Sequence, residues 1–171
     1  RTATLPALPW TNRVYAEWSR ETLSTSAGKQ SGSYWLDRLD GELPVLDLPT
    51  DRQRPPRQDF TGATITQDLD PALSARLKET AQRLGVTPYV LLLGTFGLLL
   101  NRYSGQREIL IGSPMLGRTR PELKDLVGYF VNPAILRLDF PKNREGTDFL
   151  AHVRETVLGA LEHQDYPFPL L

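Results

Sequence analysis

One continuous apolar segment constrains the fold of this chain more than any other feature. Residues 89–100 read Tyr-Val-Leu-Leu-Leu-Gly-Thr-Phe-Gly-Leu-Leu-Leu, which is apolar on nearly every side of a helix. A membrane-crossing helix needs about 20 apolar residues, so this shorter run predicts a buried central helix of a globular fold. Its glycines, Gly94 and Gly97, are expected to let another backbone approach closely.

Strong local signals bound this helix and the one before it. Asp70 is expected to cap a helix that has Pro71 at its first position, and Thr87 with Pro88 opens the next helix in the same way. Gly85 stands where the first of these helices should stop. Residues 101–105 end the second. The first helix carries one apolar face, made of Leu73, Leu77, Ala81 and Leu84.

Three segments have the patterns of strands. Residues 60–69 alternate apolar with polar side chains, which predicts a half-buried strand. Residues 109–111 form a short apolar run, expected to be a strand buried on both faces and followed by a loop over residues 112–118. Residues 134–138 form a third strand. A final helix, capped by Thr147, is expected to bury Phe149, Leu150, Val153, Val157 and Leu161.

The first third of the chain is less regular. Residues 14–23 are expected to form a short helix, residues 24–33 a loop rich in Ser, Gly and Thr, and residues 34–39 a second helical turn. Residues 43–56 contain four prolines and should stay extended. One further turn is expected at residues 122–126. The order of elements indicates a mixed α/β fold.

Composition and the chain ends narrow the class of protein. The 171 residues include 20 Lys or Arg and 20 Asp or Glu, whereas a nucleic-acid partner requires a concentrated basic face. The absence of cysteine excludes disulfides and thiolate metal sites and fits a cytoplasmic protein. The first ten residues contain two prolines and resemble neither a signal peptide nor a membrane anchor. Both ends look like cuts within a longer chain.

The two histidines are the first candidates for a general base. His152 falls outside the expected buried stripe of the last helix and has no evident nucleophile as a partner, so we expect a solvated surface residue. His163 lies beside Gln164 and Asp165 at the end of that helix, where a cation is favourable for structural reasons alone. The sequence therefore assigns neither histidine to catalysis.

Other kinds of site find little support. No His, Asp or Glu residues fall at a recognised metal-ligand spacing with a third ligand nearby, so no metal is expected. The glycines at 112, 117 and 128 do not form a phosphate-binding loop. No pair of carboxylates stands out for glycoside chemistry, although the sequence does not exclude one.

The segment around Gly128 and Asn132 allows two interpretations. Glycine before an aromatic residue in a strand-like run suggests a bulge or a close backbone approach. Asn132 precedes a proline, which favours extended backbone and would let its amide point into a cleft and bind a substrate carbonyl or amide. Alternatively, the amide satisfies the backbone of its own loop. The residues alone leave both interpretations open.

Two motifs resemble those of a known family. Residues 127–132, Val-Gly-Tyr-Phe-Val-Asn, with Arg137 following, resemble the fifth core motif of nonribosomal peptide synthetase condensation domains, VGxFVNT with a later Arg. Residues 163–168, His-Gln-Asp-Tyr-Pro-Phe, resemble the sixth, HQDYPFE, with Pro169 where the family has Glu. Residues 48–55 also resemble the LPTDRPRP segment and residues 112–118 the GTPxxGR segment. The resemblance covers residues 15–171.

The departures from the family pattern are equally specific. The fourth motif, YxDFxxW, is matched only by Tyr15 and Trp18, because Asn12 and Val14 stand where the family has Tyr and Asp. The third motif, HHxxxDG, carries the histidine that the family uses in catalysis, and this chain has no His-His pair. The seventh motif is also missing. The resemblance therefore assigns no catalytic residue to this chain.

The resemblance implies a fold and a reaction. Condensation domains consist of two chloramphenicol-acetyltransferase-like lobes arranged in a V, each a mixed sheet with flanking helices. Residues 1–58 would form the connection between the lobes, and residues 59–171 the carboxyl-terminal lobe, incomplete at both ends. The family joins a carrier-bound acyl or aminoacyl thioester to a carrier-bound amine, forming an amide bond. The chain alone is expected to be inactive.

The resemblance also assigns roles to residues. Ser113, Tyr129, Phe130 and Asn132 would line the wall of the substrate channel. Arg118 and Arg137 would be structural or lie at the rim as charges. The geometry of the lobe would be held mainly by Gly128, His163, Gln164, Asp165 and Tyr166.

Partners and alternatives follow from the same resemblance. The chain would bind no cofactor itself, since phosphopantetheine belongs to the upstream and downstream carrier domains. Its other partners would be the amino-terminal lobe with HHxxxDG and an adjacent adenylation domain, with no nucleic acid and no membrane. An epimerisation, cyclisation or terminal condensation domain is the alternative within enzymes. A non-catalytic lobe that docks a carrier or neighbouring domain is the alternative outside them.

Overall fold

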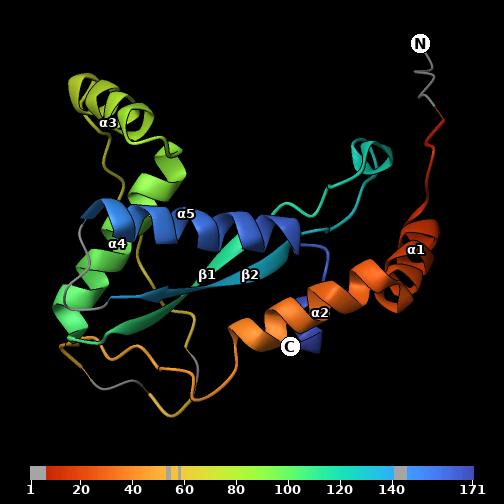
Figure 1. Ribbon diagram of the computed structural model, residues 1–171, viewed down its shortest axis with the longest axis horizontal. Helices are drawn as coiled ribbons and strands as arrows, with labels where there is room; N and C mark the ends of the chain where they lie inside the picture. The colour runs from red at the N-terminus through yellow and green to blue at the C-terminus, as the bar shows by residue number, and fades with distance from the viewer. Residues whose placement is uncertain (1–6, 53–54, 58, 141–145) are drawn as a thin grey trace. The chain divides into compact units, whose positions relative to one another are not determined.

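The computed structural model describes residues 7–52, 55–57, 59–140 and 146–171 and confirms the mixed α/β class (Figure 1). The expectations about the first six residues and about Arg54 in the proline-rich motif lie outside the described residues. The helices and strands, in chain order, are α1 Asn12–Ser24, α2 Ser26–Arg38, α3 Pro71–Arg83, α4 Pro88–Ser104, β1 Glu108–Met115, β2 Asn132–Asp139 and α5 Gly146–Glu162. Two 3-10 turns, Pro121–Leu123 and Phe168–Leu170, complete the described elements.

The chain divides into two compact units, each built from segments that are far apart in the sequence. Unit 1 comprises Arg1–Leu43, Leu110–Arg137 and Thr156–Leu171, and unit 2 comprises Pro44–Ile109 and Leu138–Glu155. The division predicted from the sequence, between residues 58 and 59, follows the expected lobes of a larger domain and stays a prediction.

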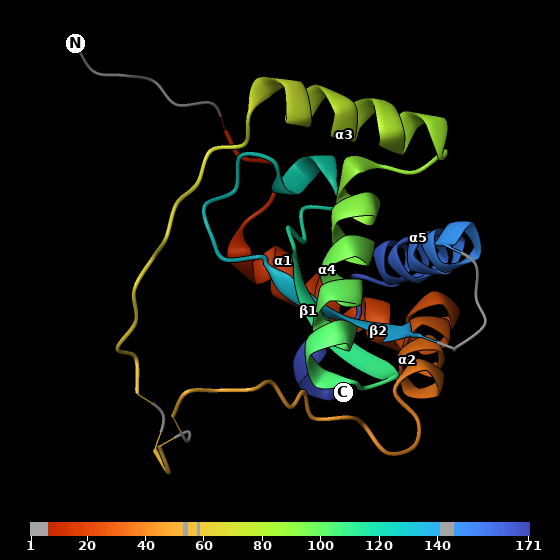
Figure 2. The same ribbon diagram turned by 90° about the vertical axis from the view of Figure 1, so that its left-hand side faces the viewer.

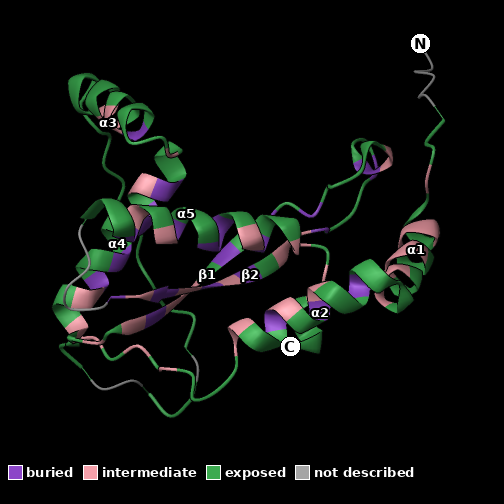
Figure 3. Ribbon diagram, in the orientation of Figure 1, coloured by how far each residue is buried: buried purple, intermediate pink, exposed green. Residues whose placement is uncertain are grey.

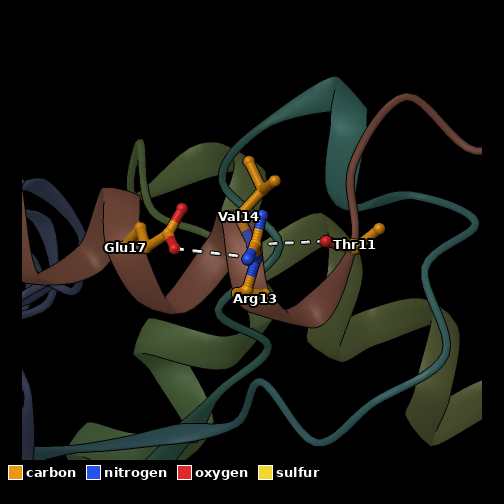
Figure 4. A network of polar contacts seen from close by, with 4 residues as sticks. All are labelled: Thr11, Arg13, Val14 and Glu17. Carbon is orange, nitrogen blue, oxygen red and sulfur yellow. Dashed lines mark hydrogen bonds and ion pairs between the residues drawn. The ribbon is translucent and has the colours of Figure 1, made fainter.

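The start of α1 is fixed by its own side chains (Figure 4). The Thr11 hydroxyl accepts a hydrogen bond from the Val14 N–H at 3.3 Å, which satisfies one of the free donors of the first turn. Arg13 and Glu17 form an exposed ion pair at 3.7 Å, four residues apart on the helix. The predicted helix over residues 14–23 is thus confirmed, with two more residues before it and one after.

The predicted loop over residues 24–33 is wrong, because most of it belongs to α2. Thr25 alone separates the two helices: its hydroxyl donates to the Thr22 carbonyl at 2.6 Å and accepts from the Gly28 N–H at 3.1 Å. Ser, Gly and Thr are typical of loops in isolation. Here the glycines of α2 instead permit close packing, since a Cβ on Gly32 would lie 2.9 Å from the Tyr166 ring.

The capping signals of α3 and α4 are confirmed. Asp70 accepts the Ala72 N–H at 2.6 Å and Thr87 accepts the Val90 N–H at 3.2 Å, each followed by proline at the first helical position. Gly85 and Gly105 end the two helices with positive φ angles of 66° and 70°. Such angles are costly for any residue with a Cβ atom. These boundaries depend only on neighbouring residues.

The prediction that α4 is buried on all sides is wrong. Val90, Leu93 and Leu100 are buried, whereas the opposite side exposes about half of Leu92, Phe96 and Leu99 (Figure 3). The apolar composition of the helix indicates how much surface it offers for burial. It does not indicate how many sides the neighbouring elements of unit 2 cover.

Gly94 and Gly97 do permit a close approach, but to side chains rather than to the predicted backbone. A Cβ on Gly97 would lie 2.8 Å from Leu138 Cδ1 and 3.0 Å from Phe140 Cζ. A Cβ on Gly94 would lie 3.0 Å from Leu150 Cδ2. Phe140 stacks in turn on Phe149 with ring centroids 5.0 Å apart, so the core of unit 2 is built around these two glycines.

β1 and β2 form a two-stranded sheet within the described residues. The Phe140 N–H, just after β2, donates to the Arg107 carbonyl, just before β1, at 2.7 Å. The end of one strand therefore meets the start of the other, and the pair is antiparallel. Both predicted strands exist, but β1 extends through Met115 into the predicted loop over residues 112–118.

β1 is also not buried on both faces as predicted. Ile109, Ser113 and Met115 are buried, while the residues between them are intermediate or exposed. An antiparallel sheet commonly covers one face only, and the alternation in β1 is typical of that arrangement. The apolar run at residues 109–111 was too short to reveal this pattern.

The strand predicted at residues 60–69 does not form. The segment is extended without regular structure and leaves 89% of Phe60 and 93% of Ile65 exposed (Figures 2 and 3). Alternating apolar residues predict a strand only when a partner strand supplies backbone hydrogen bonds and a surface to pack on. In the described part of the chain, the sheet contains only β1 and β2.

α5 follows its predicted stripe in part. Phe149, Val153 and Val157 are buried, whereas 42% of Leu161 is exposed and Leu150 is half-buried. Thr156 and Ala160 are buried in addition, so the buried face is rotated slightly from the predicted one. Thr147 lies inside the first turn rather than at the cap, because the helix begins at Gly146.

Among the described residues, no single helix has both the length and the apolar composition that crossing a bilayer requires. The sharply bent pair of α3 and α4 meets that criterion only when the two helices are counted together.

The packing around Gly97 generates a prediction. Gly97→Ala should lower the free energy of unfolding by about 1–3 kcal/mol, because the new methyl group overpacks the space occupied by Leu138 and Phe140. The higher helix propensity of alanine offsets at most about 1 kcal/mol of this loss. Urea unfolding measures the difference. Gly112→Ala is the control, since a Cβ there meets nothing within 4 Å. Equal stability of the two variants would contradict the packing argument.

Candidate functional site

The fifth and sixth motifs converge with α1 on one hollow in unit 1. Its walls come from α1, from the loop that leads into β2 and from the turn that follows α5. The lining residues are Tyr15, Trp18, Ser19, Gly117, Tyr129, Phe130, Val131, Asn132, Gln164, Asp165 and Pro167.

The loop between β1 and β2 is shaped by a glycine and an arginine. Gly117 has a φ of 64°, and a Cβ there would collide with the Phe130 carbonyl oxygen. Arg118 donates from Nη1 to the carbonyl oxygens of Leu123 and Leu126, the latter at 2.9 Å. Its guanidinium also lies 4.4 Å from the centre of the Phe130 ring. Arg118 thus holds the loop together through its carbonyls and the Phe130 ring. Whether its role is structural or at the rim stays a prediction.

Phe130 belongs to a small core rather than to an open wall. Only 6% of it is exposed, and it packs with Leu123 and Leu126, with Trp10 and Tyr15 alongside. Tyr15 meets the Phe130 ring edge-on at a centroid distance of 4.8 Å. This cluster holds the start of α1 against the loop and forms the floor of the hollow.

Asn132 links the two motifs. Its Nδ2 donates to the carbonyl oxygens of Gln164 at 2.8 Å and Tyr166 at 2.7 Å, and its Oδ1 accepts from the Phe168 N–H at 2.9 Å. An asparagine amide has two N–H donors, and both are used. The amide therefore satisfies a backbone, as one interpretation held, but in a turn 32 to 36 residues away rather than in its own loop. It has no donor left for a substrate.

His163 is enclosed by α2. The Ser31 hydroxyl lies 3.0 Å from its Nδ1, and the Tyr34 ring stacks on the imidazole at 4.2 Å between centroids. The Trp35 indole N–H donates to the His163 carbonyl at 2.9 Å. These contacts position the turn after α5, and the structural role of His163 stays a prediction.

Ser31 was missed by the sequence analysis because residues 24–33 were interpreted as a loop, and Trp35 was placed in the predicted helical turn over residues 34–39 without a role in the site. A signal was nevertheless present. Trp35 is only 2% exposed, and a buried indole N–H usually finds a hydrogen-bond partner. Gly28 and Gly32, four residues apart, mark the helix face that another segment approaches, and Tyr166 occupies that position at Gly32.

Arg137 closes the carboxyl end of α2. Its Nη1 donates to the carbonyl oxygens of Asp40 at 2.8 Å and Arg38 at 3.3 Å. A cation beside free helix carbonyls is favourable electrostatically and completes their hydrogen bonds. Arg38 itself donates to the Thr156 hydroxyl at 2.8 Å, which explains how buried Thr156 is satisfied. Like Arg118, Arg137 binds backbone carbonyls of its own chain.

The other predicted site residues differ widely in exposure. Tyr129 is 85% exposed at the edge of the hollow, whereas Ser113 is only 8% exposed, on β1. Asp165 is exposed and accepts a hydrogen bond from the Thr119 hydroxyl at 2.9 Å. Gln164 donates from Nε2 to the Leu161 carbonyl at 2.7 Å. Gly128 is tightly packed, since a Cβ there would lie 3.0 Å from the Phe130 ring.

The chemistry available at this site is limited. His152 is half-buried rather than solvated, since its Nε2 is shielded from water, and it does not border the hollow. Among the residues that the structure describes, no group of His, Asp and Glu side chains could hold a metal ion. The hollow offers aromatic faces, one carboxylate and a rigid backbone. These groups can bind and orient another molecule, but they form no pair of nucleophile and base.

Burial and charge shift the acidity of Tyr15. Burial raises the pKa of its phenol above the ordinary value of 10.0, and the nearby negative charge of Asp165 raises this pKa further. Burial also raises the pKa of Tyr34, while Arg38 opposes that increase. The carboxylate and the Tyr15 phenol therefore share one electrostatic environment at the hollow.

Comparison with known proteins gives a consistent result. The family model described as the condensation domain matches residues 1–171. The chain is 42% identical over 164 residues to a plipastatin synthase polypeptide of Bacillus subtilis (strain 168), covering 96% of this chain and 6% of that protein. It is 40% identical over 163 residues to tyrocidine synthase 3 of Brevibacillus parabrevis, covering 95% and 2%. The chain thus spans only a small part of these relatives.

Solved structures agree with the fold. The X-domain in a complex with OxyB from teicoplanin biosynthesis superimposes with a TM-score of 0.87 at 26% identity, covering 98% of this chain and 38% of that one. A four-domain nonribosomal peptide synthetase bound to AMP and glycine superimposes with a TM-score of 0.79 at 25% identity, covering 87% of this chain and 11% of that one. The first condensation domain of the CDA synthetase superimposes with a TM-score of 0.77 at 18% identity, over 98% of this chain and 37% of that one. At this identity the match supports the fold alone.

The hydrogen bonds of Asn132 generate a second prediction. Asn132→Ala should lower the free energy of unfolding by about 1–3 kcal/mol, because two partly buried carbonyls lose their partners, as does the exposed Phe168 N–H. Hydrogen exchange at the Phe168 amide should accelerate in the same variant. Asn12→Ala is the matched control, since exposed Asn12 makes one bond, to the Val127 carbonyl at 3.2 Å. A loss no larger than that of the control would refute the assigned role.

The titration of Tyr15 generates a third prediction. Asp165→Asn should lower the pKa of Tyr15 but leave it above 10.0, because burial is the larger cause of the shift. Tyr34 is an internal control, since Asp165 is not among the causes of its shift. NMR of labelled tyrosine rings in alkaline solution separates the two groups.

Stability should respond to pH with a defined sign. The folded chain holds the Tyr15 proton more tightly than the unfolded chain does. The free energy of unfolding therefore falls as the pH rises from 10.0 through the folded pKa. Tyr15→Phe should make this fall shallower, and an unchanged pH profile would argue against the shift.

Proposed function

Because the chain belongs to the condensation-domain family, we propose that it forms the carboxyl-terminal lobe of a condensation domain in a nonribosomal peptide synthetase. The observation that carries the proposal is the Asn132 amide, which joins the fifth and sixth motifs at the border of one hollow. Two motifs that are distant in the sequence thus form one structural unit, with a chloramphenicol-acetyltransferase-like fold around them.

The proposed reaction is the formation of an amide bond. The amine of an acceptor on one carrier domain attacks the thioester carbonyl of a donor on another. The carbon–nitrogen bond forms, the carbon–sulfur bond breaks, and the phosphopantetheine thiol of the donor carrier leaves. Both arms arrive as parts of substrates, and no residue of this chain is proposed to bind phosphopantetheine permanently.

The contribution of this chain is a rigid wall. Tyr129, exposed at the edge of the hollow, is proposed to face the channel. Phe130 and Asn132 are proposed to support this wall. Phe130 anchors the loop in the small core with Leu123 and Leu126, and Asn132 holds the turn after α5. Ser113 stays a predicted wall residue, although its burial on β1 limits its contact with a substrate.

The catalytic histidine is proposed to come from another segment. The sequence contains His152 and His163 but no His-His pair. Holding two reactants in a productive geometry can contribute about 7–11 kcal/mol to a reaction, so a lobe without a base can still be essential. The proposal therefore includes the amino-terminal lobe with HHxxxDG, two carrier domains and an adjacent adenylation domain as partners, in the cytoplasm.

A second candidate is a docking lobe without catalysis. The similarity to the X-domain, which was solved as a complex with OxyB, favours it. A lobe of this kind would keep the rigid motifs without needing a catalytic partner. Activity, rather than fold, distinguishes it from the leading proposal.

The leading proposal predicts the outcome of a lobe exchange. The chain alone, mixed with loaded donor and acceptor carriers, should form no peptidyl thioester. Residues 1–171, grafted in place of the matching segment of a plipastatin synthase condensation domain, should restore product detectable by mass spectrometry. Changing the second histidine of HHxxxDG to alanine in this hybrid should reduce the rate by about 10²–10⁴-fold.

The controls separate the two candidates. The unmodified plipastatin domain shows that the carriers are loaded, and circular dichroism shows that the hybrid is folded. A folded hybrid without activity would favour the docking lobe. Product formed by the chain alone would refute both.

A further inference from the structure

The hollow in unit 1 combines aromatic faces with a single charged group. Tyr15, Trp18 and Tyr129 contribute aromatic rings, and Asp165 is the only Asp, Glu, Lys or Arg among the lining residues. The influence of Asp165 on the Tyr15 pKa indicates that the carboxylate acts across this space. Aromatic faces attract cations through their electron-rich surfaces, and a carboxylate attracts them directly.

Several of the amide donors around the hollow are already engaged with backbone carbonyls. Both Asn132 donors bind carbonyl oxygens of the turn after α5, and Gln164 donates to Leu161. Acceptor capacity is available at the Asp165 carboxylate, the Gln164 side-chain oxygen and the Ser19 hydroxyl, and Asp165 is the one acceptor among them that carries a charge. A guest with N–H donors can satisfy these acceptors.

The aromatic cluster already binds guanidinium groups from its own chain. Arg120 lies 4.7 Å from the centre of the Trp18 ring, and Arg118 lies 4.4 Å from that of Phe130. Arg118 is also tied to backbone carbonyls of its loop. Within the described part of the chain, neither Arg118 nor Arg120 forms an ion pair with Asp165. The ion pair found among the described residues joins Arg13 to Glu17 on α1. The carboxylate thus lacks a cation that the hollow is suited to receive.

We propose that this hollow is a binding site for one guanidinium group, the side chain of an arginine on another protein segment. The planar guanidinium would lie against Tyr15 and Trp18 and donate to the Asp165 carboxylate. Guanidinium suits the site better than the ammonium of lysine, because it stacks on aromatic rings and donates in a fixed fork to a carboxylate.

This site does not depend on the proposed function. It uses groups within unit 1 and no catalytic partner. Binding can be measured on the chain itself, so a failure of the lobe exchange would leave the result intact. A failure of binding would equally leave the condensation proposal standing.

The test titrates the chain with N-acetyl-arginine amide and with the citrulline analogue, which has nearly the same shape but no charge. Binding is followed by NMR at the Trp18 indole N–H, assigned with Trp18→Phe. The arginine probe should give a saturable shift, and the citrulline probe should bind at least about tenfold more weakly, because its bond to the carboxylate is not charge-assisted.

Two variants complete the test. Asp165→Asn should weaken arginine binding at least about tenfold while keeping an acceptor for Thr119 and hence the fold. Asp125→Asn, which removes an exposed carboxylate that does not border the hollow, should bind as the parent chain does. Equal binding of both probes, undiminished binding by Asp165→Asn, or no saturable shift at the solubility limit would overturn the proposal.

Discussion

The three hydrogen bonds of Asn132 are the interaction on which the rest of the site depends. They connect β2 to a turn more than 30 residues later and satisfy two carbonyls and one N–H that form no regular structure. A partly buried carbonyl without a partner would cost about 1–3 kcal/mol, so the Asn132 amide stabilises this turn by pairing with two of them. The border of the hollow formed by this turn is therefore held to β2 by one side-chain amide.

Trp35, on α2, also holds the turn after α5. Its indole binds the carbonyl of His163, while Asn132 binds those of Gln164 and Tyr166. The carbonyls of His163, Gln164 and Tyr166 are thus held by two elements, α2 and β2, that are distant in sequence. Asp165 lies between these anchored residues, which keeps its exposed carboxylate beside the aromatic rings of α1. A rigid turn with one exposed charge can serve either a reaction channel or a docked partner.

The sequence predictions were accurate where the structure depends on neighbouring residues, and they were wrong where it depends on residues far away in the sequence. The starts of α3 and α4 were predicted correctly, because Asp70 and Thr87 cap their helices through residues two or three positions away. The strand at residues 60–69 was wrong, because alternation records an apolar face but not a partner for it. The loop at residues 24–33 was wrong for the converse reason: packing against Tyr166 favours a helix where composition favours a loop.

The sequence by itself determined the fold class, the boundaries of α3 and α4 and the family, since these depend on local capping signals and on motifs that can be recognised without coordinates. Only the tertiary structure decided what Asn132 does. The sequence left its amide free to bind a substrate or its own loop, and the structure pairs it with the backbone of the turn after α5. The physical reason is that a hydrogen bond requires its two atoms to lie about 3 Å apart, and chain folding alone decides which distant groups come that close.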